Sequence, residues 1–175
     1  APSRHMKSKE GKTMSLKDNK VVVRKFLKSC NAPTGDRMRR IRYARDQAAK
    51  LEKDIRSGFS RVLAPDYIEH GPRSDMTFEE LIQWAVSLKT AFPDLTYKIE
   101  DMVAGGDKVV VRYSARGTHL GRFVDVPPSR KKILIDGIYI AQMAGGKIAE
   151  GWYASNIFSA KEIFEQLKLF LLKKK

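Results

Sequence analysis

The chain has 175 residues, of which 42% are hydrophobic and 9% aromatic, as expected for one folded domain. Its net charge of +14 lies mainly in residues 1–64, where 18 Lys and Arg stand against 6 Asp and Glu. The chain has one cysteine, Cys30, so it cannot form an internal disulfide, and we predict a reducing, cytoplasmic location. Because the sequence has no Cys/His cluster, we also predict no metal site. No apolar run approaches the roughly 20 residues that a membrane helix needs, so we expect no membrane association.

The N-terminal region begins with a polar, basic stretch at residues 1–16 that lacks the apolar segment of a signal peptide. We interpret this stretch as a disordered basic tail or the remnant of an expression tag. A helix is predicted over 17–30, with Asp18 or Asn19 as its cap, and a break rich in Pro, Gly and Asp follows at 31–36. The apolar face of this helix comprises Val22, Val23, Phe26 and Leu27.

The segment 36–62 has apolar residues at helical spacings and predicts a second helix. Its other faces carry five arginines, namely Arg37, Arg39, Arg40, Arg42 and Arg45. This density of arginine suits contacts to phosphates, so nucleic acid or another polyanion is one candidate partner. We favour the alternative of a solvated helix face plus a disordered tail, because charge composition alone is weak evidence for a partner. Tyr43 is the only aromatic residue nearby that could stack on bases, so a platform for single-stranded nucleic acid is not indicated.

The middle of the chain changes from helical to strand periodicity. Residues 64–75 are predicted as a loop or short extended segment, and Thr77 with Glu80 forms a capping box that opens a helix, which Pro93 ends. Alternating patterns then predict strands at 95–104, 108–119, 131–143 and 147–156.

A second capping box, Ser159 with Glu162, predicts a final short helix before a basic tail at 173–175. Helices thus precede an antiparallel meander. This order predicts an α+β fold with helices packed on one face of a curved sheet. We expect a single domain over residues 17–172.

Several short motifs follow one another in a recognisable order. They are "HGP" at 70–72, "FPDL" at 92–95, "GTH" at 117–119, "PP" at 127–128 and "GGKIAEGW" at 145–152. In this order the chain resembles the SnoaL-like polyketide cyclase family of the nuclear-transport-factor-2-like superfamily, over roughly residues 62–168. The resemblance implies a cone whose concave sheet and covering helices enclose a ligand pocket, in many members within a homodimer.

The resemblance also implies a chemistry. Cyclases of this family close polyketide rings by an aldol step that needs no metal or bound cofactor, and we expect neither here. Their catalytic Asp lies four residues after the Trp of the "E-x-W" motif, a position that Asn156 occupies in this chain. Because an amide has no titratable proton near neutral pH, Asn156 can position a substrate but cannot exchange protons with it.

Three residues are therefore the candidate acids and bases: His119, Glu150 and His70. His119 shares a strand side with Val109 and Val111, which directs its ring toward the expected pocket, although it could instead pin the turn after the strand. Glu150 could equally form a salt bridge at the rim, and a lone loop histidine such as His70 is often exposed to solvent. The candidate ligand-binding residues are Asn156, Gln142, Trp152, Tyr113 and Tyr139, with core packing as the alternative for the aromatic ones.

The leading functional prediction is a SnoaL-like protein that binds, and transforms by acid/base chemistry, a small hydrophobic carbonyl compound. We expect a homodimer that pairs through the outer face of the sheet. The alternative function is a non-catalytic module of the same fold that binds nucleic acid or another polyanion through the Arg-rich segment 36–62. Nucleic acid is the less favoured partner of the two.

Overall fold

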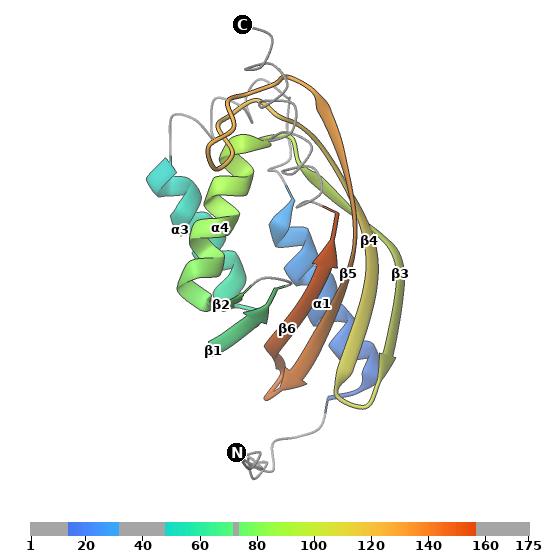
Figure 1. The fold of residues 1–175 in the computed structure, drawn as a ribbon. Helices are drawn as coiled ribbons and strands as arrows, with labels where there is room; N and C mark the ends of the chain where they lie inside the picture. Colours follow the sequence, from blue (N-terminus) through green and yellow to red (C-terminus); the bar gives the residue numbers. More distant parts are fainter. Residues whose placement is uncertain (1–13, 32–47, 72–73, 157–175) are drawn as a thin grey trace, which may run out of the picture.

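The computed structural model describes residues 14–31, 48–71 and 74–156 (Figure 1). The helices in these ranges are α1 (Leu16–Cys30), α3 (Ala48–Ser60) and α4 (Phe78–Ala91). The strands are β1 (Leu63–His70), β2 (Asp75–Thr77), β3 (Thr96–Gly105), β4 (Lys108–Thr118), β5 (Lys132–Ala144) and β6 (Lys147–Ser155).

The strands form one curved sheet in the order β2-β1-β6-β5-β4-β3. Every pairing is antiparallel except that of β1 with β6. Figure 1 shows α1 lying across the concave side of the sheet, with α3 and α4 forming the opposite wall. This arrangement confirms the predicted α+β cone with helices packed on the concave face. In the described part of the chain, no helix is both long enough and apolar enough to span a bilayer.

Helix α1 begins earlier than the sequence pattern predicts. Its N-cap is Ser15, whose Oγ accepts a hydrogen bond from the Asp18 backbone N–H, so neither Asp18 nor Asn19 is the cap. Asn19 is instead buried, and the predicted apolar residues Val23, Phe26 and Leu27 face the core. Ser15 and Leu16 therefore belong to the folded domain rather than to the N-terminal tail.

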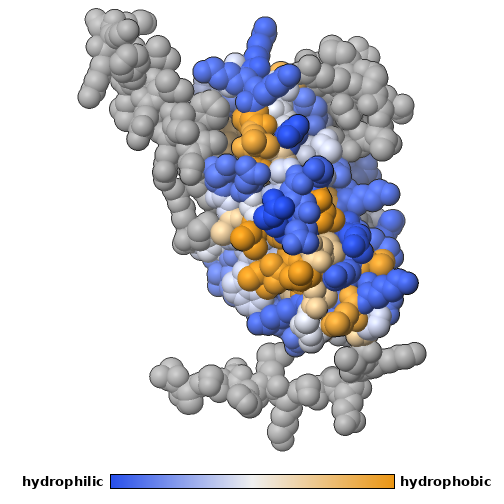
Figure 2. Space-filling view, turned by 90° about the vertical axis from the view of Figure 1, so that its right-hand side faces the viewer, coloured by the Kyte–Doolittle hydropathy of each residue, from blue (hydrophilic) through white to orange (hydrophobic). Residues whose placement is uncertain are grey.

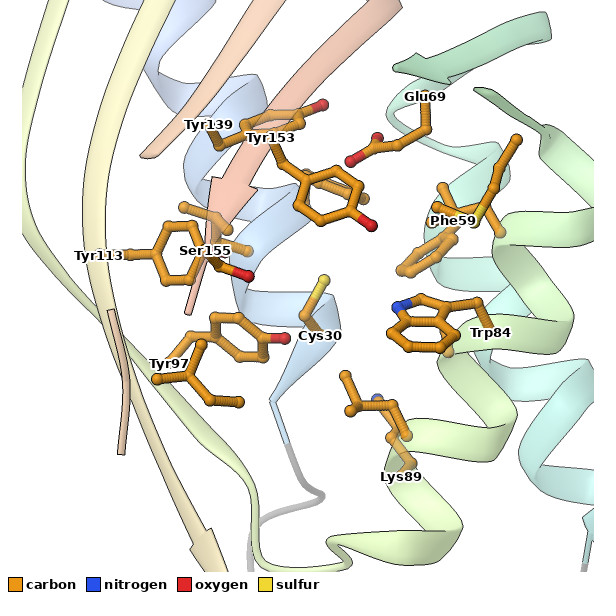
Figure 3. A pocket seen from close by; sticks show the side chains of 17 residues that line it. Cys30, Phe59, Glu69, Trp84, Lys89, Tyr97, Tyr113, Tyr139, Tyr153 and Ser155 are labelled. Carbon is orange, nitrogen blue, oxygen red and sulfur yellow. The ribbon is translucent and has the colours of Figure 1, made fainter. Parts of the chain in front are cut away.

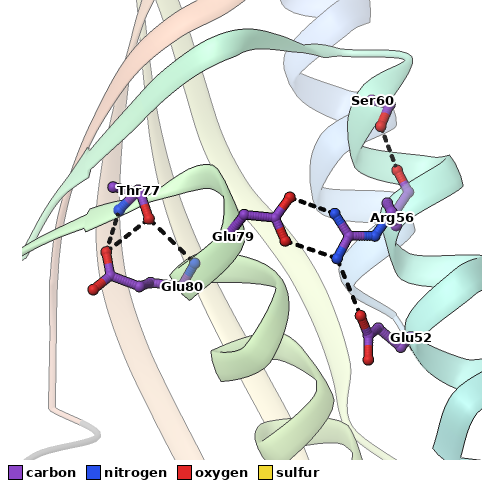
Figure 4. A network of polar contacts seen from close by, with 6 residues as sticks. All are labelled: Glu52, Arg56, Ser60, Thr77, Glu79 and Glu80. Carbon is purple, nitrogen blue, oxygen red and sulfur yellow. Dashed lines mark hydrogen bonds and ion pairs between the residues drawn. The ribbon is translucent and has the colours of Figure 1, made fainter.

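Helix α4 carries the predicted capping box. The Thr77 hydroxyl accepts from the Glu80 backbone N–H, and the Glu80 carboxylate accepts from the Thr77 backbone N–H (Figure 4). The next residue toward the N-terminus, Glu79, accepts hydrogen bonds from both terminal nitrogens of the Arg56 guanidinium, with N···O distances of 2.5 and 2.8 Å. Arg56 also donates to the carboxylate of Glu52. The cap fixes where α4 starts, and the ion pair ties this start to α3.

The predicted helix over 36–62 is described only from residue 48, and the helix ends at Ser60. The next segment, predicted as a loop or extended segment, is strand β1, which pairs with the distant strand β6. Strands β3 to β6 begin and end within one or two residues of their predicted bounds, whereas no strand was predicted at the position of β2. The five arginines of residues 37–45 and the helix predicted from Ser159 lie outside the described residues.

The core lies between the concave face of the sheet and the three helices. The inward residues of β4 include Val109, Val111, Tyr113 and Ala115, all buried as the strand alternation predicts. The Phe26 ring of α1 lies 5.2 Å from the Phe59 ring of α3 and 5.4 Å from the Tyr139 ring of β5. These aromatic contacts connect α1 and α3 to the middle of the sheet, and the three rings are part of the lining of a cavity.

Candidate ligand pocket

A cavity of about 100 Å³, partly open to solvent, lies between the sheet and the helices (Figure 3). Most of its lining is aromatic or aliphatic, with few polar groups, which is the usual composition of a small-molecule site. The polar or titratable lining residues are Cys30, Glu69, Lys89, Tyr97, Tyr113, Tyr139, Tyr153 and Ser155. The described residues contain no group of three or more His, Cys, Asp or Glu that could hold a metal ion.

Glu69 is the acidic side chain of this cavity. It points inward from β1, is 5% exposed, and accepts a hydrogen bond from the Tyr67 hydroxyl. The Tyr67 hydroxyl lies 3.1 Å from the Tyr139 hydroxyl. Burial disfavours the ionised carboxylate and raises the pKa of Glu69 to about 8. Glu69 is therefore largely protonated at neutral pH, yet its pKa lies close enough to neutrality for it to give or take a proton.

The backbone of β6 approaches this cluster closely. Gly151 of β6 lies against it, and a Cβ at this position would approach the Tyr67 hydroxyl oxygen to 2.1 Å and the Tyr139 hydroxyl oxygen to 2.7 Å. These separations are shorter than any van der Waals contact, so only glycine fits between the two phenols. The absence of a side chain on β6 thus makes room for the cluster.

Lys89 and Cys30 occupy another part of the cavity. The Lys89 ammonium donates to the backbone carbonyls of Ser29 at 2.8 Å and Asn31 at 3.1 Å, at the end of α1. Burial lowers the pKa of Lys89. Burial also raises the pKa of the Cys30 thiol to about 12, so the thiol is protonated and a poor nucleophile at neutral pH.

Tyrosines form much of the sheet-side wall. The rings of Tyr97 and Tyr113 lie 5.5 Å apart, and Tyr139 and Tyr153 complete the wall. Burial raises the pKa of all four phenols, which therefore remain neutral hydrogen-bonding groups. Facing them from α4 is Trp84, so a flat hydrophobic ligand would be held between aromatic surfaces (Figure 3).

The structure brings together only part of the set of site residues predicted from the sequence. Tyr113 and Tyr139 line the cavity. Glu150, Trp152 and Asn156 share one side of the last strand, as predicted, but this is the outer side of the sheet. Successive residues of a strand point to opposite faces, and Tyr153 and Ser155 occupy the cavity side of β6. Gln142, which pairs with Glu150 across β5 and β6, also lies outside the lining.

Asn156, at the position where the resemblance implies a catalytic Asp, makes backbone contacts. Its Oδ1 accepts from the Asp136 backbone N–H at 3.0 Å, and its own backbone N–H donates to the Asp136 carbonyl at 3.2 Å. Asn156 thus extends the pairing of β5 with β6 by one step. Its amide is engaged in the sheet and does not line the cavity.

His70 and Glu150 meet on the outer face of the sheet, away from the cavity. The His70 ring stacks on Trp152 with 4.9 Å between ring centres. Its Nδ1 lies 2.9 Å from Asp75 Oδ1, and its Nε2 lies 3.5 Å from Glu150 Oε2. Glu150 thus contacts a histidine on the outer face of the sheet, and neither Glu150 nor His70 is among the residues that line the cavity.

His119 is buried just beyond the end of β4, and it does not line the cavity either. Its Nδ1 accepts from the Ser129 backbone N–H at 3.2 Å and lies 3.1 Å from the Ser129 hydroxyl, while its ring packs 5.1 Å from Phe92. Burial lowers its pKa. His119 thus connects the loop that contains Ser129 to Phe92, which is the kind of contact that the alternative of a histidine at the turn describes.

The sequence did not predict the acidic and basic side chains that line the cavity. Glu69 lines the cavity and Tyr67, which donates to it, lies two residues earlier on β1, a segment predicted only as a loop or short extended segment. A strand assignment there would have placed both residues on one face. Lys89 lies near the end of the predicted α4 helix, but no local pattern distinguishes it from a solvated lysine. Its position depends on the carbonyls of α1, a separate element.

The chain is similar in sequence to one protein family and in fold to several solved structures. The sequence profile of the SnoaL-like polyketide cyclase family matches residues 44–161, well over half of the chain. None of the curated proteins compared with it matches. A provisionally assigned SnoaL-like polyketide cyclase from Jannaschia sp. CCS1 is similar in structure, with a TM-score of 0.64 at 20% identity over 88% of this chain and 97% of the other.

Two Streptomyces proteins are also similar in structure. AclR from Streptomyces galilaeus, provisionally described as a hydroxylase, has a TM-score of 0.62 at 20% identity over 82% of this chain and 92% of its own. IdmH from Streptomyces antibioticus, a provisionally assigned polyketide cyclase, has a TM-score of 0.54 at 25% identity over 63% of this chain and 87% of its own. The family profile and these shared folds agree, and the chain belongs to the SnoaL-like polyketide cyclase family.

Proposed function

We propose that this protein binds a small hydrophobic carbonyl compound in the cavity and catalyses proton transfer at the carbon next to the carbonyl, with Glu69 as the acid/base. The single observation that carries the proposal is a buried carboxyl group, with its pKa raised to about 8, in the lining of an otherwise aromatic cavity. Such a group fits general acid/base catalysis without a cofactor, because it exchanges protons near neutral pH.

The reaction begins when ionised Glu69 removes a proton from the α-carbon. The electron pair of the broken C–H bond forms the enolate, and Glu69 becomes the carboxylic acid. The enolate carbon can then attack a second carbonyl of the same molecule, or it can take the proton back. Tyr67 holds the carboxyl group in place, and neutral phenols in the wall can donate hydrogen bonds to the enolate oxygen.

The test measures exchange of the α-hydrogens of 2-indanone for deuterium in D₂O, above the rate in buffer alone. This ketone is flat, aromatic and enolisable. With Glu69 as base, exchange should increase up to a pH near 8 and then level off. Glu69→Gln should reduce it by about a hundredfold or more, in line with the usual contribution of a positioned acid/base.

Glu150→Gln is the comparison variant, because Glu150 is the carboxylate that the sequence names as a candidate acid or base. Circular dichroism and thermal melting would verify that both variants fold. If exchange persists in Glu69→Gln and disappears in Glu150→Gln, the assignment to Glu69 is wrong.

We further propose that two copies of the chain pair through the outer face of the sheet. Three apolar side chains on this face are about half exposed, namely Val103 at 56%, Leu134 at 53% and Ile138 at 48%. Figure 2 shows hydrophobic groups of this kind interspersed with hydrophilic ones. Arg112 and Asp101, which pair across β3 and β4, supply charges of both signs. A surface with both signs of charge can be complementary to a second copy of itself.

A further inference from the structure

The cavity has two polar ends. Figure 3 shows Glu69 at one end and Lys89 at the other, with the tyrosine wall and Trp84 between them. The two side chains come from β1 and from the last turn of α4, elements that hold them apart. A ligand that fills the cavity therefore meets a carboxyl group at one end and an amine at the other.

The charges at the two ends differ at neutral pH. Glu69 is largely protonated because burial raises its pKa to about 8, and the cavity phenols and the Cys30 thiol are neutral for the same reason. Burial lowers the pKa of Lys89, but the carbonyl dipoles at the end of α1 favour its charged form. Of the described residues that line the cavity, Lys89 is thus the one that provides a positive charge.

The Lys89 ammonium is only partly satisfied by the described protein groups that it contacts. An ammonium group has three N–H donors, and the carbonyls of Ser29 and Asn31 accept two hydrogen bonds. The carboxylate that acts on it electrostatically is that of Asp54, whose effect is smaller than that of burial. Within the described ranges no ion pair joins a carboxylate to Lys89, and a buried cation in such a setting gains most from an anion that brings its own charge into the site.

We infer that Lys89 is an anion subsite and that the ligand is a carbonyl compound that also bears a carboxylate. The carboxylate binds the third N–H of Lys89, and the reacting carbonyl end lies toward Glu69. This inference rests on the proposed function of the cavity and adds the charge of the substrate. Because Glu69 is mostly protonated, it does not repel such a monoanion.

A purely structural role for Lys89 is the alternative. Its ammonium joins the end of α1 to α4, and the Asn31 side chain in turn accepts from the Tyr97 backbone N–H at 2.6 Å. If this were its only role, the loss of Lys89 would loosen the cavity and weaken all ligands alike. The two roles are therefore separated by comparing an anionic probe with a neutral one of the same shape.

Benzoate and benzamide are such a pair, since they differ in charge but hardly in size. Their dissociation constants are measured by calorimetry at pH 7 and low ionic strength. We expect wild-type protein to bind benzoate at least about tenfold more tightly than benzamide, the difference expected for a charge-assisted hydrogen bond. Lys89→Met should remove this preference and leave benzamide binding unchanged. Lys108→Met, a lysine over Trp152 on the outer face, controls for the general loss of positive charge.

Three results would overturn the inference. They are equal affinity of the two probes for wild-type protein, a parallel loss of both in Lys89→Met, and no binding of either probe at millimolar concentration. The outcome is independent of catalysis, because Glu69→Gln should keep the benzoate preference even though it slows deuterium exchange by about a hundredfold or more. A protein that fails the exchange test but discriminates between the probes would retain the anion subsite and lose only the proposed chemistry.

Discussion

Burial of Glu69 couples its ionisation to the stability of the fold. Its pKa is raised from 4.5 to about 8 in the folded state, so the folded protein holds this proton over a pH range in which the unfolded chain has released it. The resulting stabilisation is complete below the unfolded pKa and is lost as the pH rises through the folded pKa.

Between about pH 5 and 8 the free energy of unfolding should therefore fall in wild-type protein relative to Glu69→Gln. The relative slope should approach ~1.4 kcal/mol per pH unit, the value for one proton. Urea denaturation of both proteins at several pH values measures this difference, from which groups common to both cancel. A difference that does not change with pH would show that Glu69 is ionised in the folded protein.

At the residue scale, the sequence predicts which side chains share a strand side better than it predicts which side faces the cavity. The grouping of Glu150, Trp152 and Asn156 follows from strand alternation. Assigning the inner side usually relies on a contrast between an apolar inner face and a polar outer face. That contrast is weak here, because the inner face of β6 carries Tyr153 and Ser155 and the outer face carries Trp152. Because β6 presents polar or aromatic side chains on both faces, its sequence pattern does not show which face lines the cavity.

At the element scale, the capping box at the start of α4 supports both the helix and its attachment to α3. Thr77→Ala removes the acceptor for the Glu80 backbone N–H and should lower the free energy of unfolding by about 1 kcal/mol. Thr77→Ser keeps the hydroxyl and should stay within a few tenths of a kcal/mol of wild type. Chemical denaturation of the three proteins gives the comparison. Equal losses in both variants would mean that the methyl group, not the cap, is what matters.

The elements best predicted from the sequence are those defined by local contacts. The hairpins of β3 with β4 and of β5 with β6 close through short turns, in which Gly106 and Gly145 adopt positive φ angles. Strand β1 was predicted only as a loop or extended segment because it contains Pro65 and Asp66, which are rare in strands, and because it pairs in parallel with β6. A pairing between segments so far apart leaves no local pattern. For this reason the set of site residues predicted from the sequence did not include Glu69 or Tyr67.

At the scale of the whole molecule, the cone has two separate surfaces of different character. The concave side and the helices enclose the cavity, and the convex side presents exposed apolar groups (Figures 2 and 3). A substitution on the convex side can therefore test association without touching the cavity lining. Ile138 is suited to this purpose, because it is 48% exposed on β5, a strand in the interior of the sheet.

Ile138→Lys should convert a dimer into a monomer, because pairing through this face would bury the new charge without a designed partner. Light scattering after size-exclusion chromatography should give about twice the chain mass of 19.9 kDa for wild-type protein and one chain mass for the variant. Val21→Lys is the matched control, since Val21 is 39% exposed on α1, away from the sheet face. If wild-type protein is a monomer, or if only Val21→Lys dissociates it, the outer face of the sheet is not the interface. Because Ile138 lies outside the cavity lining, Ile138→Lys should bind benzoate like wild type, and a loss of binding would mean that pairing shapes the pocket.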